Sequence, residues 1–356
     1  MPETSLSIKV KKINGEKVLV LANKLGITNR VLQIHRNSEH IYVPLIRRPE
    51  ESELAKLKAQ VPDMELTNSV FTKKKQQGKT LVDVLENKLP PYLLASLPRA
   101  LDVIGDIAII EVPPELEARK NLIGNAILKV HKNVRTVLAK AGAVSGTYRL
   151  RSFEVIAGEP RTSTIHREYG CQYYVDVAKA YFSPRLSHEH DRVASLVQKS
   201  ETVVDLFSGV GPFAVLIAKN NPDAKVYAID INPEAIELLE RNIRMNRVEN
   251  HVISILGDAR QTVERRLMGV ADRVIMNLPE KAIEFVDVAC NALKPIGGTV
   301  HYYAFVRSPD SLENVQQRFS EAVDKAGRKV NSFLLAKTIR ETAPYESQIV
   351  VDAKIL

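Results

Sequence analysis

The sequence predicts an α/β fold built around an open, largely parallel sheet, and three observations lead to this prediction. Residues 203–213 show an apolar strand pattern, a glycine turn and the start of a helix. A second strand pattern, residues 225–230, ends in Asp230, and a third, residues 252–256, is followed by Gly257. In open α/β sheets the carboxyl ends of such strands surround the crevice in which nucleotides bind. The sequence therefore predicts a nucleotide-like ligand at one edge of this sheet.

Residues 1–72 are predicted to form a small N-terminal α+β domain. A hairpin turn is expected at Asn14-Gly15, a pair that favours tight turns between strands. The expected strands lie at residues 5–10, 17–22 and 41–45, and the expected helix lies at residues 51–58. Residues 73–79 follow as a basic linker, whose composition suits either a solvated tether or a contact with a polyanion.

Residues 80–172 are predicted to form a mixed α/β middle domain. Pro113 and Pro114 separate a strand, or a strand pair, from a long amphipathic helix. The expected elements lie at residues 80–88 (helix), 102–112 (strands), 115–130 (helix), 134–139 (strand) and 153–157 (strand). A cluster of arginines lies among polar residues, at Arg149, Arg151, Arg161 and Arg167. A solvated charged face and a surface that contacts phosphate or a base explain this cluster equally well.

Residues 173–356 are predicted to hold the parallel sheet. Its first strand, residues 173–177, leads through a loop to a helix at residues 187–199, for which Ser187 is the expected N-cap. A fourth buried strand, residues 273–276, ends in Asn277-Leu278-Pro279-Glu280, and this turn is expected to face the same crevice as the glycine turn. Further strands are expected at residues 299–303, 333–334 and 348–351.

The charge of the chain favours a polyanionic partner. The 356 residues include 50 Lys and Arg against 42 Asp and Glu, a formal net charge of +8. Residues 1–80 hold 15 of the basic and 8 of the acidic side chains, so most of the excess lies there. Cys171 and Cys290 match no disulfide or zinc pattern. With no signal-peptide pattern and no apolar run of bilayer length, we expect a cytoplasmic protein without a membrane partner.

The glycine turn after the strand that begins at residue 203 indicates which kind of nucleotide would bind. It reads D-L-F-S-G-V-G-P-F from Asp205 to Phe213 and lacks the G-x-G-x-x-G pattern of a dinucleotide site. Asp230 is placed to accept hydrogen bonds from ribose hydroxyls, and Asp258 to accept one from an adenine amine. Each motif alone is ordinary at a strand end, but their order resembles that of class I S-adenosylmethionine-dependent methyltransferases.

This resemblance implies a Rossmann-like catalytic domain with S-adenosylmethionine as its cofactor. The glycines of the turn would let a ligand approach the backbone closely. By the resemblance, the cofactor-binding residues are expected to be Asp205, Phe207, Gly209, Gly211, Asp230, Ile231, Asp258, Ala259, Asn277 and Pro279.

The turn after the fourth strand indicates which kind of nitrogen atom accepts the methyl group. Enzymes of this class that methylate exocyclic amines often carry Asn-Pro-Pro-aromatic at this place, whereas this chain has Asn277-Leu278-Pro279-Glu280. A ring nitrogen is the other acceptor to consider. Because N1 of guanine carries a proton at neutral pH, its methylation requires a carboxylate that removes the proton and a cation that stabilises charge on O6.

Several segments in order give a more specific resemblance. They are residues 102–108 (DVIGDIA), 148–151 (YRLR), 164–170 (TIHREYG), 181–189 (YFSPRLSHE), the glycine turn and 277–279 (NLP). They resemble the archaeal and eukaryotic tRNA (guanine-N1)-methyltransferases that modify position 37, next to the anticodon. The resemblance covers residues 80–356 and, more loosely, the first 75. It implies that the N-terminal domain contacts the outer corner of tRNA.

The resemblance also assigns roles to single residues. Glu189 matches the acid that removes the N1 proton, Arg149 the cation at guanine O6, and Asn277 the amide of the fourth strand. The expected substrate-binding residues are Arg149, Tyr181, Arg185 and Pro279. The expected partner is tRNA, contacted at its anticodon loop and outer corner by a monomer that needs no metal.

Other interpretations stay open. Glu189 could be a first-turn acid favoured by the helix dipole, Arg149 a surface charge and Asn277 a strand-end cap. His166 and His188 are expected to be structural. A related wyosine-pathway enzyme would methylate a tricyclic guanosine derivative, or transfer an aminocarboxypropyl group, at the same tRNA position. A non-catalytic RNA-binding protein with a degenerate methyltransferase fold is the second alternative.

Overall fold

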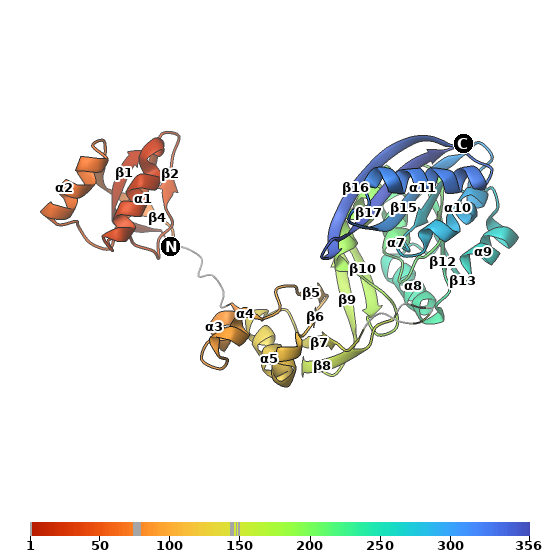
Figure 1. The fold of residues 1–356 in the computed structure, drawn as a ribbon, viewed down its shortest axis with the longest axis horizontal. Coiled ribbons are helices and arrows are strands. Elements are labelled where there is room, and N and C mark those ends of the chain that lie inside the picture. The colour runs from red at the N-terminus through yellow and green to blue at the C-terminus, as the bar shows by residue number, and fades with distance from the viewer. Residues whose placement is uncertain (1, 74–79, 143–145, 147, 149) are drawn as a thin grey trace. The chain divides into compact units, whose positions relative to one another are not determined.

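The computed structural model describes residues 2–73, 80–142, 146, 148 and 150–356. The chain forms two compact units, Met1–Gly78 and Lys79–Leu356 (Figure 1). Each unit has its own hydrophobic core. The predicted linker, residues 73–79, lies outside the described residues except for Lys73. None of the described helices combines the length and the apolar composition that crossing a bilayer requires.

The N-terminal unit is an antiparallel sheet with two helices, the α+β arrangement that the sequence predicts. The strand order is β2-β3-β1-β4. The elements are β1 (Glu3–Lys11), η1 (Lys12–Asn14), α1 (Gly15–Lys24), β2 (His35–Arg36), β3 (His40–Pro44), α2 (Glu51–Gln60) and β4 (Glu65–Phe71). Ile8 of β1, Val18 of α1 and Leu57 of α2 are buried together in the core of this unit.

The predicted N-terminal hairpin is wrong. Residues 17–22, expected to be a strand, lie in helix α1, where Gly15, Val18 and Ala22 repeat at helical spacing and are buried. A short apolar run fits both periods, so the sequence pattern did not separate them. Gly15 has helical dihedral angles, and a Cβ there would lie 2.3 Å from Ile41 Cδ1. This glycine therefore lets the helix approach β3 and does not form a hairpin turn.

The second unit begins with a four-stranded sheet in the order β5-β6-β7-β8, in which β6 and β7 run parallel and the other pairs antiparallel. The elements are α3 (Leu81–Leu85), α4 (Pro91–Ala95), β5 (Asp102–Ile104), β6 (Ile107–Ile110), η2 (Pro114–Arg119), α5 (Lys120–Val130), β7 (Thr136–Lys140) and β8 (Phe153–Gly158). The long helix expected at residues 115–130 is divided into the 3-10 helix η2 and α5. Ile107 and Leu138 join the core of the larger sheet described next, so a domain boundary at residue 172 stays a prediction.

The larger sheet has seven strands in the order β13-β12-β11-β14-β15-β17-β16. The first five run parallel, and β17 and β16 are antiparallel to their neighbours. The elements are η3 (Pro184–Leu186), α6 (Ser187–Leu196), β11 (Thr202–Asp205), α7 (Pro212–Asn220), β12 (Lys225–Asp230), α8 (Pro233–Asn246), β13 (Val252–Leu256), α9 (Ala259–Thr262), η4 (Val263–Leu267), β14 (Arg273–Met276), η5 (Ala282–Phe285), α10 (Val286–Ala292), β15 (Gly298–Arg307), α11 (Leu312–Lys325), β16 (Val330–Ala343) and β17 (Glu346–Ile355). This order confirms the predicted Rossmann-like α/β fold.

Helices cover both faces of this sheet. Residues of α6, α7 and α8 pack in one core with Val203, and residues of α9, α10 and α11 pack in the other with Val204. Successive residues of β11 therefore face opposite layers, as expected for a strand buried on both sides. The strand order reverses between β11 and β14, so α7, which follows β11, and α10, which follows β14, lie on opposite faces and leave a crevice at the carboxyl ends.

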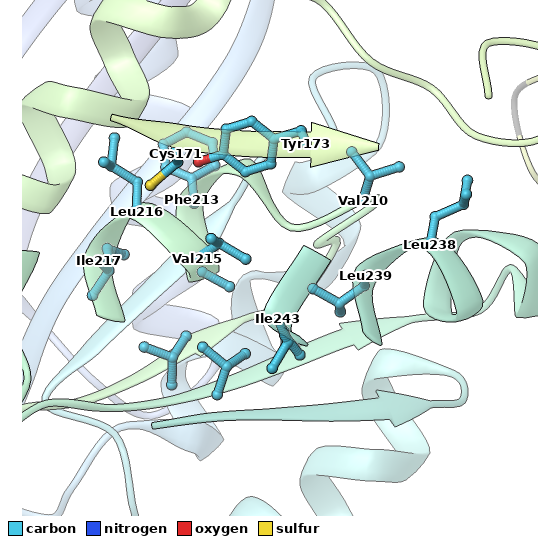
Figure 2. Packing of buried hydrophobic residues seen from close by; sticks show 14 of the residues in the cluster. Cys171, Tyr173, Val210, Phe213, Val215, Leu216, Ile217, Leu238, Leu239 and Ile243 are labelled. Carbon is cyan, nitrogen blue, oxygen red and sulfur yellow. The ribbon is translucent and has the colours of Figure 1, made fainter. Parts of the chain in front are cut away.

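A separate hairpin of β9 (Ser163–Glu168) and β10 (Cys171–Asp176) packs against the first of these helical layers. Strand β10 accounts for the strand expected at residues 173–177, whereas β9 was not expected. Figure 2 shows Tyr173 of β10 beside Phe213 of α7 within this core. The Tyr173 hydroxyl donates to the carbonyl oxygen of Pro212 (3.2 Å), which fixes the hairpin to the start of α7.

Helix α6 and the last strands differ in detail from expectation. Ser187 is the first residue of α6 and not its N-cap, because Leu186 occupies that position without a side-chain capping hydrogen bond. The helix ends at Leu196, before the expected residue 199. Strands β16 and β17 extend well beyond the short segments expected at residues 333–334 and 348–351, because they pair with each other along most of their length.

Replacing Gly211 by Ala should destabilise the protein by about 2–4 kcal/mol. Its φ of +85° is unfavourable for any residue with a Cβ, and a Cβ there would lie 2.2 Å from Leu239 Cδ1. Gly170→Ala is the matched control, because Gly170 also has a positive φ (+77°) but nothing within 4 Å of its Cβ position. Urea denaturation should show a loss of only about 1 kcal/mol for the control. Equal losses for both variants would contradict the steric explanation.

Candidate active site

A cleft with a volume of about 320 Å³ opens at the carboxyl ends of β11, β12, β13 and β14. This is the place where the strand order reverses, and the sequence predicted a ligand site there. The cleft is lined by Tyr148, Tyr181, Phe182, Ser183, Leu186, His190, Leu206, Phe207, Ser208, Gly209, Pro212, Phe213, Asp230, Ile231, Asn232, Ala235, Gly257, Asp258, Ala259, Asn277, Leu278, Pro279, Lys281, Glu284, Phe285, Phe305 and Gln348.

Asp230, the last residue of β12, holds the glycine turn in place. Its Oδ2 accepts a hydrogen bond from Gly209 N–H (2.7 Å), and its Oδ1 accepts one from Asn232 N–H (2.9 Å). Burial raises the pKa of Asp230 above its usual range. Each carboxylate oxygen has a further lone pair, so Asp230 retains the capacity to accept hydrogen bonds from hydroxyl groups of a ligand.

Two polar side-chain atoms that line the cleft lack a hydrogen-bond partner within the described part of the chain. They are Ser208 Oγ, in the turn after β11, and Asn277 Oδ1, directly after β14. Native proteins pair nearly all of their buried polar atoms, because an unpaired one costs about 1–3 kcal/mol. A ligand that offers hydrogen-bond donors in the cleft would satisfy both atoms, and a nucleoside is such a ligand.

Asp205 lies at the end of β11 and is completely buried. Its Oδ1 accepts a hydrogen bond from Phe207 N–H (3.3 Å), and its Oδ2 has no partner among the described residues. Burial raises the pKa of Asp205 to about 7, and the nearby negative charge of Asp230 adds to this effect. Asp205 therefore acts on the cleft through the backbone of the glycine turn.

Apolar and aromatic groups complete the cleft. The rings of Phe207 and Phe285 meet edge to face, with centroids 5.0 Å apart and an interplanar angle of 85°. Asp258 caps helix α9, because its Oδ1 accepts a hydrogen bond from Gln261 N–H (3.0 Å). A few polar groups at strand ends beside apolar walls are typical of a site for a flat, partly polar ligand.

Most of the cofactor residues predicted from the sequence lie around this cleft. Those that line it are Phe207, Gly209, Asp230, Ile231, Asp258, Ala259, Asn277 and Pro279. Of the other described positions, Asp205 is buried behind the turn and Gly211 makes room for α8. Tyr181 lines the cleft, Arg185 lines a neighbouring cavity, and Arg149 lies outside the described residues.

Glu189 lies in a buried cluster of charges. Arg192 Nε donates to its Oε2 (2.9 Å), Lys337 Nζ forms an ion pair with its Oε1 (2.7 Å), and the Tyr303 hydroxyl donates to its Oε2 (3.3 Å). Burial favours the protonated acid, but Arg192 and Lys337 outweigh that effect and hold the pKa of Glu189 below its usual range. The next residue along α6, His190, lines the cleft, whereas Glu189 is not among the described residues that line it.

The same cluster extends into the C-terminal strands. Arg192 Nη1 donates to Asp352 Oδ2 of β17 (2.5 Å), so this arginine bridges two carboxylates. His301 of β15 accepts a hydrogen bond from Arg273 Nη1 at Nε2 (2.8 Å) and donates from Nδ1 to Asp352 Oδ1 (2.6 Å). Burial lowers the pKa of His301, which agrees with a neutral ring in this arrangement.

Sequence reasoning missed several residues of the site. His190 is held by a hydrogen bond between its Nδ1 and Glu168 Oε1 (2.7 Å). Phe305 of β15 lies beyond the strand expected at residues 299–303, and Gln348 of β17 is the first residue of the strand expected at residues 348–351. Nothing in their local sequence indicates a ligand site. Phe285 could have been found, because it is the aromatic residue that closely follows the turn after the fourth strand.

Family models match three parts of the chain. The model described as the TRM5/TYW2 methyltransferase domain matches residues 164–331. The TYW2 N-terminal domain matches residues 81–162, and the tRNA methyltransferase 5 N-terminal domain matches residues 7–53. Together these matches span both compact units.

Curated relatives match over nearly the whole chain. The tRNA (guanine(37)-N(1))-methyltransferase Trm5b of Pyrococcus abyssi is 38% identical, over 99% of each chain. The protein of the same name from Methanocaldococcus jannaschii is 32% identical, over 98% of each chain. The tRNA 4-demethylwyosine(37)-methyltransferase Taw21 of Saccharolobus solfataricus is 33% identical, over 78% of this chain and 99% of its own.

Solved structures agree with these relatives. The crystal structure of Trm5b from Pyrococcus abyssi superimposes with a TM-score of 0.74 at 37% identity, covering 99% of each chain. The complex of aTrm5 with tRNALeu has a TM-score of 0.70 at 33% identity, covering 99% of this chain and 100% of the other. Trm5 of Methanocaldococcus jannaschii in complex with adenosine has a TM-score of 0.64 at 31% identity, covering 98% and 99%.

The raised pKa of Asp205 predicts a pH dependence of stability. An acid whose folded pKa (about 7) exceeds its unfolded value (3.8) favours the folded state when protonated, so this contribution is lost as pH rises from about 4 to above 7. Asp205→Asn keeps the oxygen that accepts from Phe207 and does not titrate. Urea denaturation should therefore show that the variant gains stability relative to wild type between pH 5 and pH 8. A difference that does not change with pH would contradict the assignment.

Proposed function

The chain belongs to the TRM5/TYW2 family of methyltransferases, and from this premise we propose that it transfers a methyl group to N1 of guanosine at position 37 of tRNA. The observation that supports the proposal most strongly is that relatives named for this activity match the sequence of both compact units. Two curated relatives with that name match 98% or more of the chain from end to end.

The wyosine-pathway activities are less favoured for this chain. The curated 4-demethylwyosine methyltransferase is itself covered almost completely but matches 78% of this chain. The two relatives named for guanosine methylation match 98% or more of this chain, and residues 7–53 match the N-terminal domain model of tRNA methyltransferase 5. The N-terminal unit therefore favours guanosine methylation over modification of a tricyclic derivative.

S-Adenosylmethionine fits the cleft and, when bound, supplies a methyl group made electrophilic by its positively charged sulfur. Asp230 and Asp258 would hold the nucleoside part of the cofactor at the ends of β12 and β13. The unpaired oxygens of Asn277 and Ser208 would accept hydrogen bonds from bound groups. Phe207, Ile231 and the backbone at Gly209 would provide the apolar contacts and the close approach.

Glu189 would accept the proton of guanine N1. Because Arg192 and Lys337 outweigh the effect of burial on its pKa, the carboxylate is ionised at neutral pH and has a lone pair for the proton, although it is a weak base while both cations stay bound. The side chain of Lys337 is 41% exposed, whereas that of Arg192 is 20% exposed and is anchored to Asp352. Lys337 is therefore the partner that the bound substrate would displace to reach the carboxylate.

Other residues would position the guanine. Asn277 at the end of β14 would fix the edge of the base, and Pro279 and Tyr181 would contact its faces. Arg149 would stabilise the negative charge that develops on O6 when the N1 proton leaves. Each of these groups, except Arg149, which lies outside the described residues, lies at the cleft, so positioning would contribute much of the rate acceleration.

The N-terminal unit would bind the outer corner of tRNA while the second unit binds the anticodon loop. The excess of basic residues in the first 80 positions and the Trm5 N-terminal domain match support this assignment. We infer that a monomer carries both contacts and that the reaction needs no metal, because the carboxylate and the charged methyl donor supply the chemistry.

Methylation of tRNA transcripts tests the function directly. An unmodified transcript with G37 should yield 1-methylguanosine when incubated with the protein and S-adenosylmethionine, and nucleoside analysis should detect it. A transcript that differs only by A37 should yield no methylated base. Absence of product from the G37 transcript, or equal labelling of both transcripts, would contradict the proposal.

Replacing Glu189 by Gln should slow single-turnover methylation about 10²-fold or more, because the amide cannot accept the N1 proton. Calorimetry should show cofactor affinity close to wild type, since Glu189 is not among the described residues that line the cleft. Asp352→Asn is the control, because Asp352 belongs to the same charge cluster without touching the cleft. If the control loses as much rate as Glu189→Gln, the effect belongs to the cluster and Glu189 is not the base.

A further inference from the structure

A second cavity lies beside the cleft and has a different chemical character. Its volume is about 250 Å³. Its charged lining consists of four basic residues, Lys140, Arg151, Arg185 and Arg340, and one acid, Asp102. We call this cavity the basic pocket. A concave surface with this charge balance concentrates positive potential and attracts anions.

The charges of the basic pocket are incompletely neutralised. Arg185 Nε donates to Asp102 Oδ1 (2.5 Å), so these two residues balance each other. Lys140 pairs with Glu111 (3.3 Å), which is outside the lining of the pocket. Among the ion pairs formed by the described residues, none involves Arg151 or Arg340. Two half-buried guanidinium groups are therefore available to an external anion.

The basic pocket and the cleft share a wall. Tyr181, Phe182 and Ser183, in the loop before η3, line both cavities. Arg340 Nη1 donates to Ser183 Oγ (3.2 Å), and its Nε donates to Gln348 Oε1 (3.0 Å), a residue that lines the cleft. The guanidinium of Arg340 is thus held by neutral partners at the boundary between the two cavities.

We propose that the basic pocket binds a phosphodiester group of the RNA strand that flanks the target guanosine, with Arg151 and Arg340 as its ligands. This inference rests on the proposed function. A base that enters the cleft carries its own backbone with it, and the two cavities are separated by one short loop. The adjoining phosphate is therefore the anion that reaches the pocket when the base is in the cleft.

The side chains suit this ligand better than a free small anion. Arginine presents a planar fork of donors that matches phosphate oxygens, and its charge is weakly hydrated. Tyr181 is 50% exposed and lies between the two cavities, where its ring is available to stack on a base. Together these groups fit a nucleotide chain, with a base on one side of the loop and its phosphate on the other.

A double-mutant cycle between protein and RNA tests the inference. Transcripts with G37 are prepared with a neutral methylphosphonate at the phosphate on the 5′ side or the 3′ side of that nucleotide. The dissociation constant of each for the full-length protein is measured at one salt concentration. We expect wild type to bind one of the two modified transcripts about tenfold more weakly than the unmodified transcript.

Arg151→Gln should bind the unmodified transcript about tenfold more weakly than wild type does. This variant should bind the sensitive methylphosphonate transcript no more weakly than it binds the unmodified one. Arg340→Gln provides a second variant, and unchanged cofactor affinity shows that each variant is folded. The matched control is Arg244→Gln, since Arg244 is an exposed arginine of α8 that lines neither cavity. This control should retain the full methylphosphonate effect.

If the methylphosphonate, on either side of the nucleotide, weakens binding by each arginine variant as much as it weakens binding by wild type, the two effects are additive. That result would contradict the proposed phosphate site. That outcome is separable from a failure of the proposed function, because the coupling is read from binding alone. If the binding data show the expected coupling between arginine and phosphate but wild type forms no 1-methylguanosine, the proposed function is wrong and the proposed phosphate site is supported.

Discussion

The hydrogen bond from Gly209 N–H to Asp230 Oδ2 is the contact on which the geometry of the cleft depends. It joins the turn after β11 to the end of β12, which lies next to β11 on the side opposite to β14. The positive φ of Gly209 aims its N–H at the carboxylate, and Asn232 N–H holds the other oxygen. Because the strand ends are tied in this way, the polar groups that follow β11, β12 and β14 converge on one cleft.

The parallel strands could be predicted because their side chains are buried on both faces and read as apolar runs, as Val203 and Val204 do. Helix α1 could not, since its apolar run also fits a strand, and the helix buries Val18 and Ala22 in a core that assembles from distant elements. Strand β9 was missed for a related reason. Its residues alternate weakly, and pairing with β10 makes it a strand.

The candidate site also has a part that the sequence predicts and a part that it does not. Strand-end motifs predicted eight of the residues that line the cleft, because the ends of parallel strands meet at one edge of a sheet. The surroundings of Glu189 could not be predicted, since Lys337, Tyr303 and Asp352 lie more than a hundred residues away and meet it only after β15, β16 and β17 have paired. The role of Arg149 stays a prediction.

The base proposed here, Glu189, would face two opposing requirements. It must lie away from water beside the substrate, which favours the protonated acid, yet it must be ionised to accept a proton. Arg192 and Lys337 resolve the conflict by outweighing the effect of burial on the Glu189 carboxylate. In the proposed mechanism Arg192, anchored to Asp352, would keep the carboxylate charged, and the more exposed Lys337 would be the partner that substrate displaces. A cluster with two fixed arginines would hold the carboxylate ionised but closed to substrate.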